Sequence, residues 1–156
     1  MDKDLFDPID HDFFRYKLKK DIEILPRFDF GYQDRDALEF FMDRFEHPLQ
    51  DLIKISCKGI VFKEGLKTNG LTCHREYDWV GLIPPLVHDS LLAEGYGDGF
   101  WMTGRYARPM RKMIDRLFLS CLYDCIEQEI GFKRVRREAH INTLYYAVRA
   151  NSIIKG

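Results

Sequence analysis

The amino-acid sequence predicts an α+β fold, with a small antiparallel sheet in the N-terminal half packed on two or three C-terminal helices. Short strand-like segments fall within the first 70 residues, whereas apolar residues at helical spacing dominate the second half. Strands followed by helices, rather than alternating with them, are typical of this class. A chain of 156 residues can bury one core of ordinary size, and we see no repeat or low-complexity linker. We therefore expect a single domain, 1–156, with residues 1–12 as an extended polar tail.

Short apolar segments indicate where the strands lie. Residues 16–25 alternate in their second half and end at Pro26, which predicts one strand. Residues 52–57 and 59–62 predict two more, and glycine favours a turn after them. Between these strands, residues 36–45 have the spacing of a short amphipathic helix.

Prolines and glycines indicate the helices of the second half. Pro84–Pro85 can open a helix, because proline is tolerated in the first turn, and this helix should end near Gly95. Pro109 should open a long helix that Gly131 ends as a C-terminal cap. A last helix is predicted over residues 137–153.

Charge and hydropathy exclude several classes of protein. The formal net charge is −1, which argues against binding of nucleic acid through the overall charge of the protein. No apolar run reaches the roughly 18–20 residues of a membrane span, and the first residues lack the pattern of a secretory signal. The four cysteines form no CxxC pair, so we expect reduced thiols in a cytosolic setting.

An imidazole and two carboxylates stand out among residues that should be buried. His88 and Asp89 lie in an apolar helix, where adjacent side chains diverge by roughly 100° and cannot pair with each other. Asp115, on the next helix, is the best partner for His88. A carboxylate that holds one ring nitrogen leaves the other free to act as a base or ligand. A catalytic site of these three residues is one hypothesis; a buried His–Asp bridge that locks two helices together is the alternative.

Two further segments carry polar groups. Cys73 and His74 follow a polar turn and could supply ligands to a divalent metal, although their spacing is no zinc signature, so we expect no resident cofactor. The basic cluster Lys133–Arg137 is predicted between two helices, as a solvated loop or cation-rich helix end, with a phosphate or nucleic-acid contact as the alternative.

The glycine-rich segment 95–104 predicts a loop with apolar tips. Phe100, Trp101 and Met102 would be a solubility liability if they stayed in water. They would dock on a partner, on a second copy in a homo-oligomer, or back on the same chain.

Four motifs together resemble domain-of-unknown-function family 1353, which is found largely in bacteriophages and prophages. Residues 65–72 resemble its "GFxTDGASIPR" element, 86–92 its "hHDyLY" element, 111–119 its "RkeaDrlFleaM" element, and 145–149 its closing "yyAVR". The resemblance covers about residues 55–150. It implies a binding role for Thr68, Asn69 and Gly70, although Asn69 stands where the family has an aspartate.

A second resemblance, at the level of motifs, is to secreted phospholipases A2. In those enzymes a histidine activates water, the adjacent aspartate binds calcium and a distant aspartate orients the histidine. The matching residues are His88, Asp89 and Asp115. The calcium loop and cysteine pattern of those enzymes are absent, so we expect no calcium lipase.

These resemblances imply two functions. One is a virion or assembly component, associated with a phage head, tail or baseplate, in which the His/Asp network is structural and other virion proteins are the partners. The other is a phage hydrolase that uses His88 as general base, oriented by Asp115. The sequence slightly favours the first, because Asn69 lacks a charge and no complete catalytic set is recognisable. Either would place the protein in the virion or the host cytoplasm.

Overall fold

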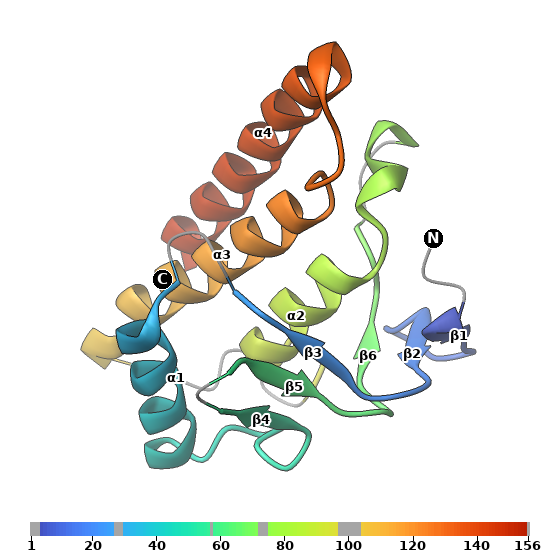
Figure 1. The fold of residues 1–156 in the computed structure, drawn as a ribbon. Helices are drawn as coiled ribbons and strands as arrows, with labels where there is room; N and C mark the ends of the chain where they lie inside the picture. The colour runs from blue at the N-terminus through green and yellow to red at the C-terminus, as the bar shows by residue number, and fades with distance from the viewer. Residues whose placement is uncertain (1–3, 27–29, 57, 72–74, 97–103, 156) are drawn as a thin grey trace.

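The protein has an α+β fold, as predicted, in which two small sheets lie against four helices (Figure 1). The computed structural model describes residues 4–26, 30–56, 58–71, 75–96 and 104–155. The strands are β1 (Phe6–Pro8), β2 (Tyr16–Leu18), β3 (Ile22–Ile24), β4 (Ile53–Ile55), β5 (Ile60–Phe62) and β6 (Lys67–Thr68). The helices are α1 (Tyr32–Arg44), α2 (Ile83–Leu92), α3 (Ala107–Asp124) and α4 (Gly131–Lys155), with 3₁₀ helices η2 (Arg75–Val80) and η3 (Gly104–Tyr106).

Both sheets are antiparallel and three-stranded. One has the strand order β1-β2-β6 and the other β3-β5-β4. The single strand predicted over residues 16–25 is therefore wrong, because it is two strands, β2 and β3, in different sheets. The polar residues between them form a turn, in which the Asp21 carboxylate accepts a hydrogen bond from the Glu64 amide at 2.8 Å. This bond lies where the chain leaves one sheet and enters the next.

The predicted N-terminal tail is extended but belongs to the fold. Residues 6–8 form β1, which pairs with β2 in the register Phe6 to Leu18. Phe6 is buried in the core. Burial of this large aromatic side chain stabilises β1 in the sheet, although the rest of the segment is polar.

The helices differ from the prediction mainly at their ends. Helix α1 begins earlier than expected, because the Asp34 carboxylate accepts the Gly31 amide at 3.1 Å as a cap. Helix α2 ends at Leu92, before Gly95, and its cap residue Ala93 is left-handed, with φ 56°. No helix within the described residues has the length and apolar character needed to cross a bilayer.

Gly131 does not cap α3, contrary to the prediction. Helix α3 ends at Asp124, and Gly131, with φ 69°, instead stands at the start of α4. The cluster Lys133–Arg137 therefore lies in the first turns of α4 and not in a loop. Cations are unfavourable at this end of a helix. Glu129 compensates them, since its carboxylate pairs with Lys133 at 3.5 Å and also with Arg137.

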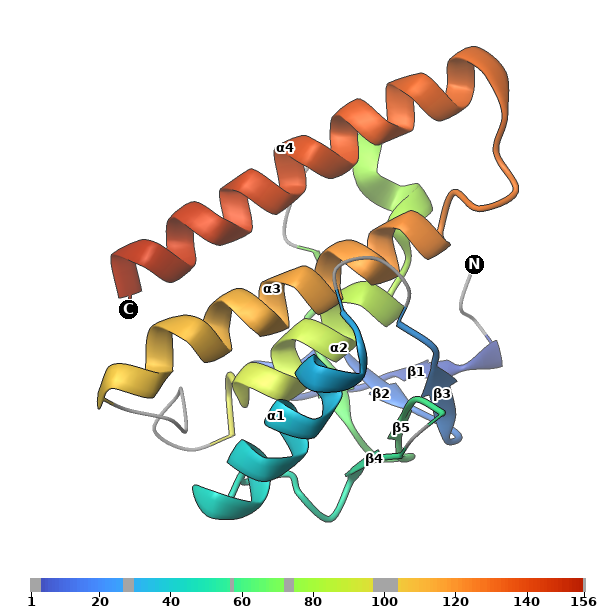
Figure 2. The same ribbon diagram turned by 60° about the vertical axis from the view of Figure 1, so that its left-hand side comes forward.

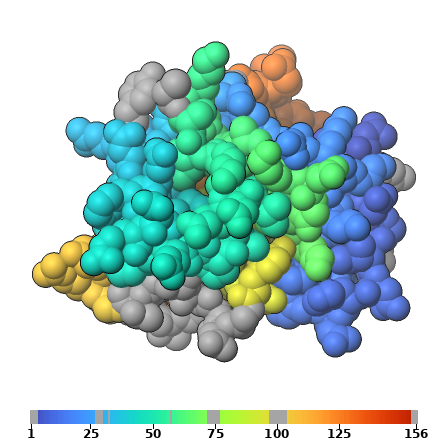
Figure 3. All heavy atoms as spheres, turned by 90° about the horizontal axis from the view of Figure 1, so that it is seen from below, coloured from blue at the N-terminus to red at the C-terminus, as the bar shows by residue number. Residues whose placement is uncertain are grey.

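The hydrophobic core consists of two clusters. The larger one brings together both sheets, α1, α2 and one face of α3; the smaller one joins η2, α3 and α4. Helices α3 and α4 form an antiparallel pair, and α2 lies between α3 and the strands (Figure 2). Helix α1 and β4 lie on the face of the molecule that is turned away from α4 (Figure 3). Helix α2, which carries His88 and Asp89, thus lies in the middle of the fold.

We predict that Gly95→Ala destabilises the protein by about 3 kcal/mol. Gly95 has φ 81°, and an added Cβ would lie 2.6 Å from Phe13 Cδ1 and 2.7 Å from Phe14 Cζ, so backbone strain and overpacking add. Gly65→Ala is the matched control, because φ is 95° but no atom lies within 4 Å of the new Cβ. It should cost about 1 kcal/mol. Urea denaturation of both variants tests this, and equal losses would contradict it.

Candidate functional site

The site is built around a buried carboxylate on α3. Asp115 is 0% exposed, and its Oδ1 lies 2.8 Å from Nε2 of His88 on α2. Its Oδ2 accepts hydrogen bonds from Arg149 Nη1 at 2.7 Å and from Ser152 Oγ at 2.8 Å, both on α4. Three helices therefore converge on one side chain. The predicted pairing of His88 with Asp115 is confirmed.

These contacts fix the proton on the His88 ring. A carboxylate can only accept, so Nε2 of the neutral imidazole carries the hydrogen that points to Asp115. The lone pair of Nδ1 is then available. No described residue bonds Nδ1, and the His88 side chain is 14% exposed, with its ring against Phe118 at a centroid distance of 5.1 Å. The imidazole is thus held from one side and open on the other.

The charge of Asp115 does not require a protonated histidine. Arg149 neutralises the carboxylate directly, since the two groups form an ion pair at 2.7 Å. Ser152, itself buried, adds a neutral donor. The cation that pairs with Asp115 is therefore Arg149, while the contact with Asp115 fixes the orientation of the His88 ring.

His47 shows what a purely structural histidine looks like in this molecule. It is 1% exposed and both ring nitrogens are paired, Nε2 with the Leu91 carbonyl oxygen at 3.0 Å and Nδ1 with the Leu49 amide at 2.9 Å. Burial lowers the pKa of His47 to about 4, although the bond to Leu91 opposes this shift. His88 differs in having a carboxylate on one nitrogen and no described partner on the other.

Asp89 points away from His88, as the helical spacing predicts. Its Oδ2 accepts a hydrogen bond from Thr68 Oγ1 at 3.0 Å, and the Asn69 backbone amide donates to the same carboxyl. Burial raises the pKa of Asp89 to about 6; nearby Glu94 adds to the rise, while His88 and the hydrogen bonds oppose it. An acid of this kind is costly to keep ionised, which is common at functional sites.

The segment Thr68–Gly70 connects Asp89 to a neighbouring pocket. The Gly70 amide donates to Thr68 Oγ1 at 3.1 Å, and Gly70 has φ 74°. Asn69 and Gly70 are among the residues that line the pocket. The predicted binding residues Thr68, Asn69 and Gly70 therefore lie together, beside Asp89 but not on the Asp115 side of His88.

Several predicted residues lie outside the described part of the chain. Cys73 and His74 are among them, as are Phe100, Trp101 and Met102 of the glycine-rich loop. Within the described residues no three His, Cys, Asp or Glu side chains are grouped as a metal would need.

Two residues of the site were missed by sequence reasoning. Arg149 was quoted only as part of a motif, and Ser152 not at all. The signal that could have found them is their spacing, because residues three apart share a helix face and both can reach one carboxylate. No family model, curated protein or solved structure matches the chain.

Proposed function

We propose that the chain is a hydrolase-type enzyme in which His88 is the general base and Asp115 the residue that orients it. The observation that carries this proposal is the asymmetry of His88, which donates from Nε2 to a buried carboxylate and presents, on a partly exposed ring, an Nδ1 that no described residue bonds. This is the arrangement that a water-activating histidine requires.

The chemistry would proceed through Nδ1. This nitrogen takes a proton from water as the water oxygen attacks an acyl or phosphoryl centre, and the imidazolium then gives the proton to the leaving group. The positive charge that forms on the ring is stabilised by Asp115, whose own position is fixed by Arg149 and Ser152. A carboxylate with such anchoring cannot turn away when His88 becomes charged.

We predict that His88→Gln lowers the rate of hydrolysis of activated esters by at least about 100-fold, as expected for loss of a general base. The probes are p-nitrophenyl acetate and bis(p-nitrophenyl) phosphate. Folding should be retained, because Asp115 keeps Arg149 and Ser152 and glutamine can still donate to it. The control is His11→Gln, since His11 is exposed and its Nδ1 accepts from the Phe13 and Phe14 amides of its own segment. If the wild-type rate on both probes is no higher than that of His88→Gln, the proposal fails.

A second candidate is the non-enzymatic virion or assembly component implied by the resemblance to family 1353. The observation that favours it is that the Asp115 carboxylate joins α2, α3 and α4, with both of its oxygens paired to side chains of the protein. The partners would then be other virion proteins. Mass spectrometry of purified phage particles tests this candidate, because a component must be present at a fixed number of copies per particle.

A further inference from the structure

A pocket of about 690 Å³ lies beside the segment Thr68–Gly70 and has no role in the chemistry proposed for His88. Its volume is within the usual range for small-molecule sites, roughly 300–1,000 Å³. The residues that line it come from β1, β2, the segment after β6, η2 and the start of α2. His88 and Asp115 are not among them.

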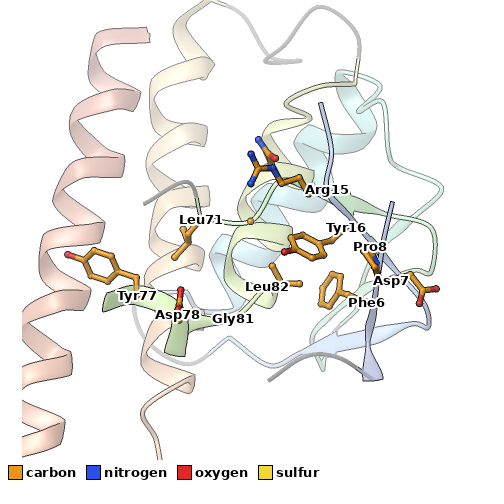
Figure 4. Close-up of a pocket in the computed structure, with 12 residues that line it drawn as sticks. Phe6, Asp7, Pro8, Arg15, Tyr16, Leu71, Tyr77, Asp78, Gly81 and Leu82 are labelled. Atoms are coloured by element: carbon orange, nitrogen blue, oxygen red, sulfur yellow. The ribbon is translucent and has the colours of Figure 1, made fainter. Parts of the chain in front are cut away.

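The wall of the pocket is largely apolar and aromatic. Phe6, Tyr16 and Leu82 are grouped near its centre, and Leu71 and Tyr77 continue the wall toward α4 (Figure 4). Gly70 keeps the space open, because a Cβ on it would lie 3.3 Å from Leu82 and 3.8 Å from Tyr16. An apolar group of a ligand would therefore find a site already formed.

Two charges of opposite sign border this apolar wall. Figure 4 shows the Arg15 and Asp78 side chains on different sides of the group formed by Tyr16 and Leu82. Neither Arg15 nor Asp78 has an ion-pair partner among the described residues, and they do not pair with each other. Asp7, the remaining acid, is already 3.8 Å from Lys19 Nζ. Among the side chains that the structure describes, Arg15 and Asp78 are thus the charges available to a ligand.

Asn69 supplies a third polar group. Its side chain lines the pocket, and its Oδ1 is buried without a hydrogen-bond partner among the described residues. The pocket thus combines a cation, an anion, a side-chain amide and an apolar wall. A simple anion would be repelled by Asp78, and a simple amine by Arg15, whereas a molecule with both charges satisfies both residues.

We propose that this pocket binds a small zwitterion with an apolar side chain, namely an amino acid or dipeptide. Arg15 pairs with the ligand carboxylate, and Asp78 pairs with its ammonium group. The Phe6, Tyr16 and Leu82 side chains contact the apolar part of the ligand. This inference holds whether or not His88 is catalytic, because the two sites share no side chain.

The test uses NMR titration with the dipeptide leucyl-phenylalanine and two blocked forms of it. Acetylation of the amine removes the charge that faces Asp78, and amidation of the carboxylate removes the charge that faces Arg15. Each block should weaken binding by about two- to fivefold, as expected for one exposed charge pair. In Arg15→Gln the free and amidated peptides should bind equally, and in Asp78→Asn the free and acetylated peptides should do so.

The control variants are Arg108→Gln and Asp51→Asn, which remove exposed charges of the same types away from the pocket. They should preserve the wild-type preference for the free dipeptide. Absence of binding at millimolar concentrations would overturn the proposal. So would equal binding of the free and doubly blocked peptides, because the pocket would then select on apolar groups alone.

Discussion

Asp115→Asn is expected to lower the free energy of unfolding by about 3 kcal/mol. The substitution removes a fully buried negative charge that three donors from α2 and α4 share. The Arg149 guanidinium would remain between the helices without its counter-charge, and breaking a buried pair from one side costs several kcal/mol. Because Arg149 is 19% exposed in its side chain, water relieves part of this cost. Urea denaturation at neutral pH measures the change.

Arg116→Gln is the matched control for Asp115→Asn. It breaks an ion pair of similar geometry, Arg116 to Asp34 at 2.9 Å, but both partners are more exposed. Such pairs contribute at most about 1 kcal/mol. In an Arg149→Gln background, Asp115→Asn should cost clearly less than in the wild type, because the two residues are coupled. If Asp115→Asn costs no more than Arg116→Gln, the buried network does not stabilise the fold.

Asp89→Asn should have the opposite effect and stabilise the protein by about 2 kcal/mol at pH 8. The pKa of Asp89 rises from 3.8 to about 6 on folding, chiefly through burial. The folded state therefore binds a proton more readily than the unfolded state between these values, and stability falls as pH rises through about 6. At pH 8 the ionised acid carries the whole cost, which at roughly 1.4 kcal/mol per pKa unit is substantial even after an allowance for partial exposure.

The difference between Asp89→Asn and the wild type should vanish near pH 4, where the folded acid is protonated. Because His47 is present in both proteins, its effect on the pH dependence of stability cancels in this difference. Its lowered pKa makes stability fall as pH drops from 6.5 toward 4 in both proteins. Chemical denaturation at pH 4, 6 and 8 tests the prediction. A difference that stayed constant over this range would show that the Asp89 carboxyl is not desolvated.

The sequence allowed the fold class and the central pair of the site to be predicted, but not the boundaries or the outer part of the network. His88 and Asp115 could be paired because helical periodicity fixes which residues share a face. The split between β2 and β3 was not visible, because it depends on pairing with distant strands, β2 with β6 and β3 with β5. The roles of Arg149 and Ser152 likewise depend on how α4 lies along α3, and side-chain pattern alone does not determine this.

The bordering residues of the pocket were missed for a similar reason. Arg15 and Asp78 are separated by more than sixty positions and belong to segments without any recognisable motif. In the sequence, each of them is indistinguishable from the many charged residues that lie on protein surfaces without a specific role. Arg15 lies just before β2 and Asp78 lies in η2. Only the folded structure shows that both residues line the same pocket.

The dependence of Asp115 on α4 has a consequence for synthesis of the protein on the ribosome. Arg149 and Ser152 follow Asp115 by 34 and 37 residues. A nascent chain that has released α2 and α3 but not the end of α4 therefore carries an acid between two apolar helices without its cation. Such a chain gains little by packing these helices early. Stable docking of α2 on α3 should thus wait until the last turns of α4 have left the exit tunnel.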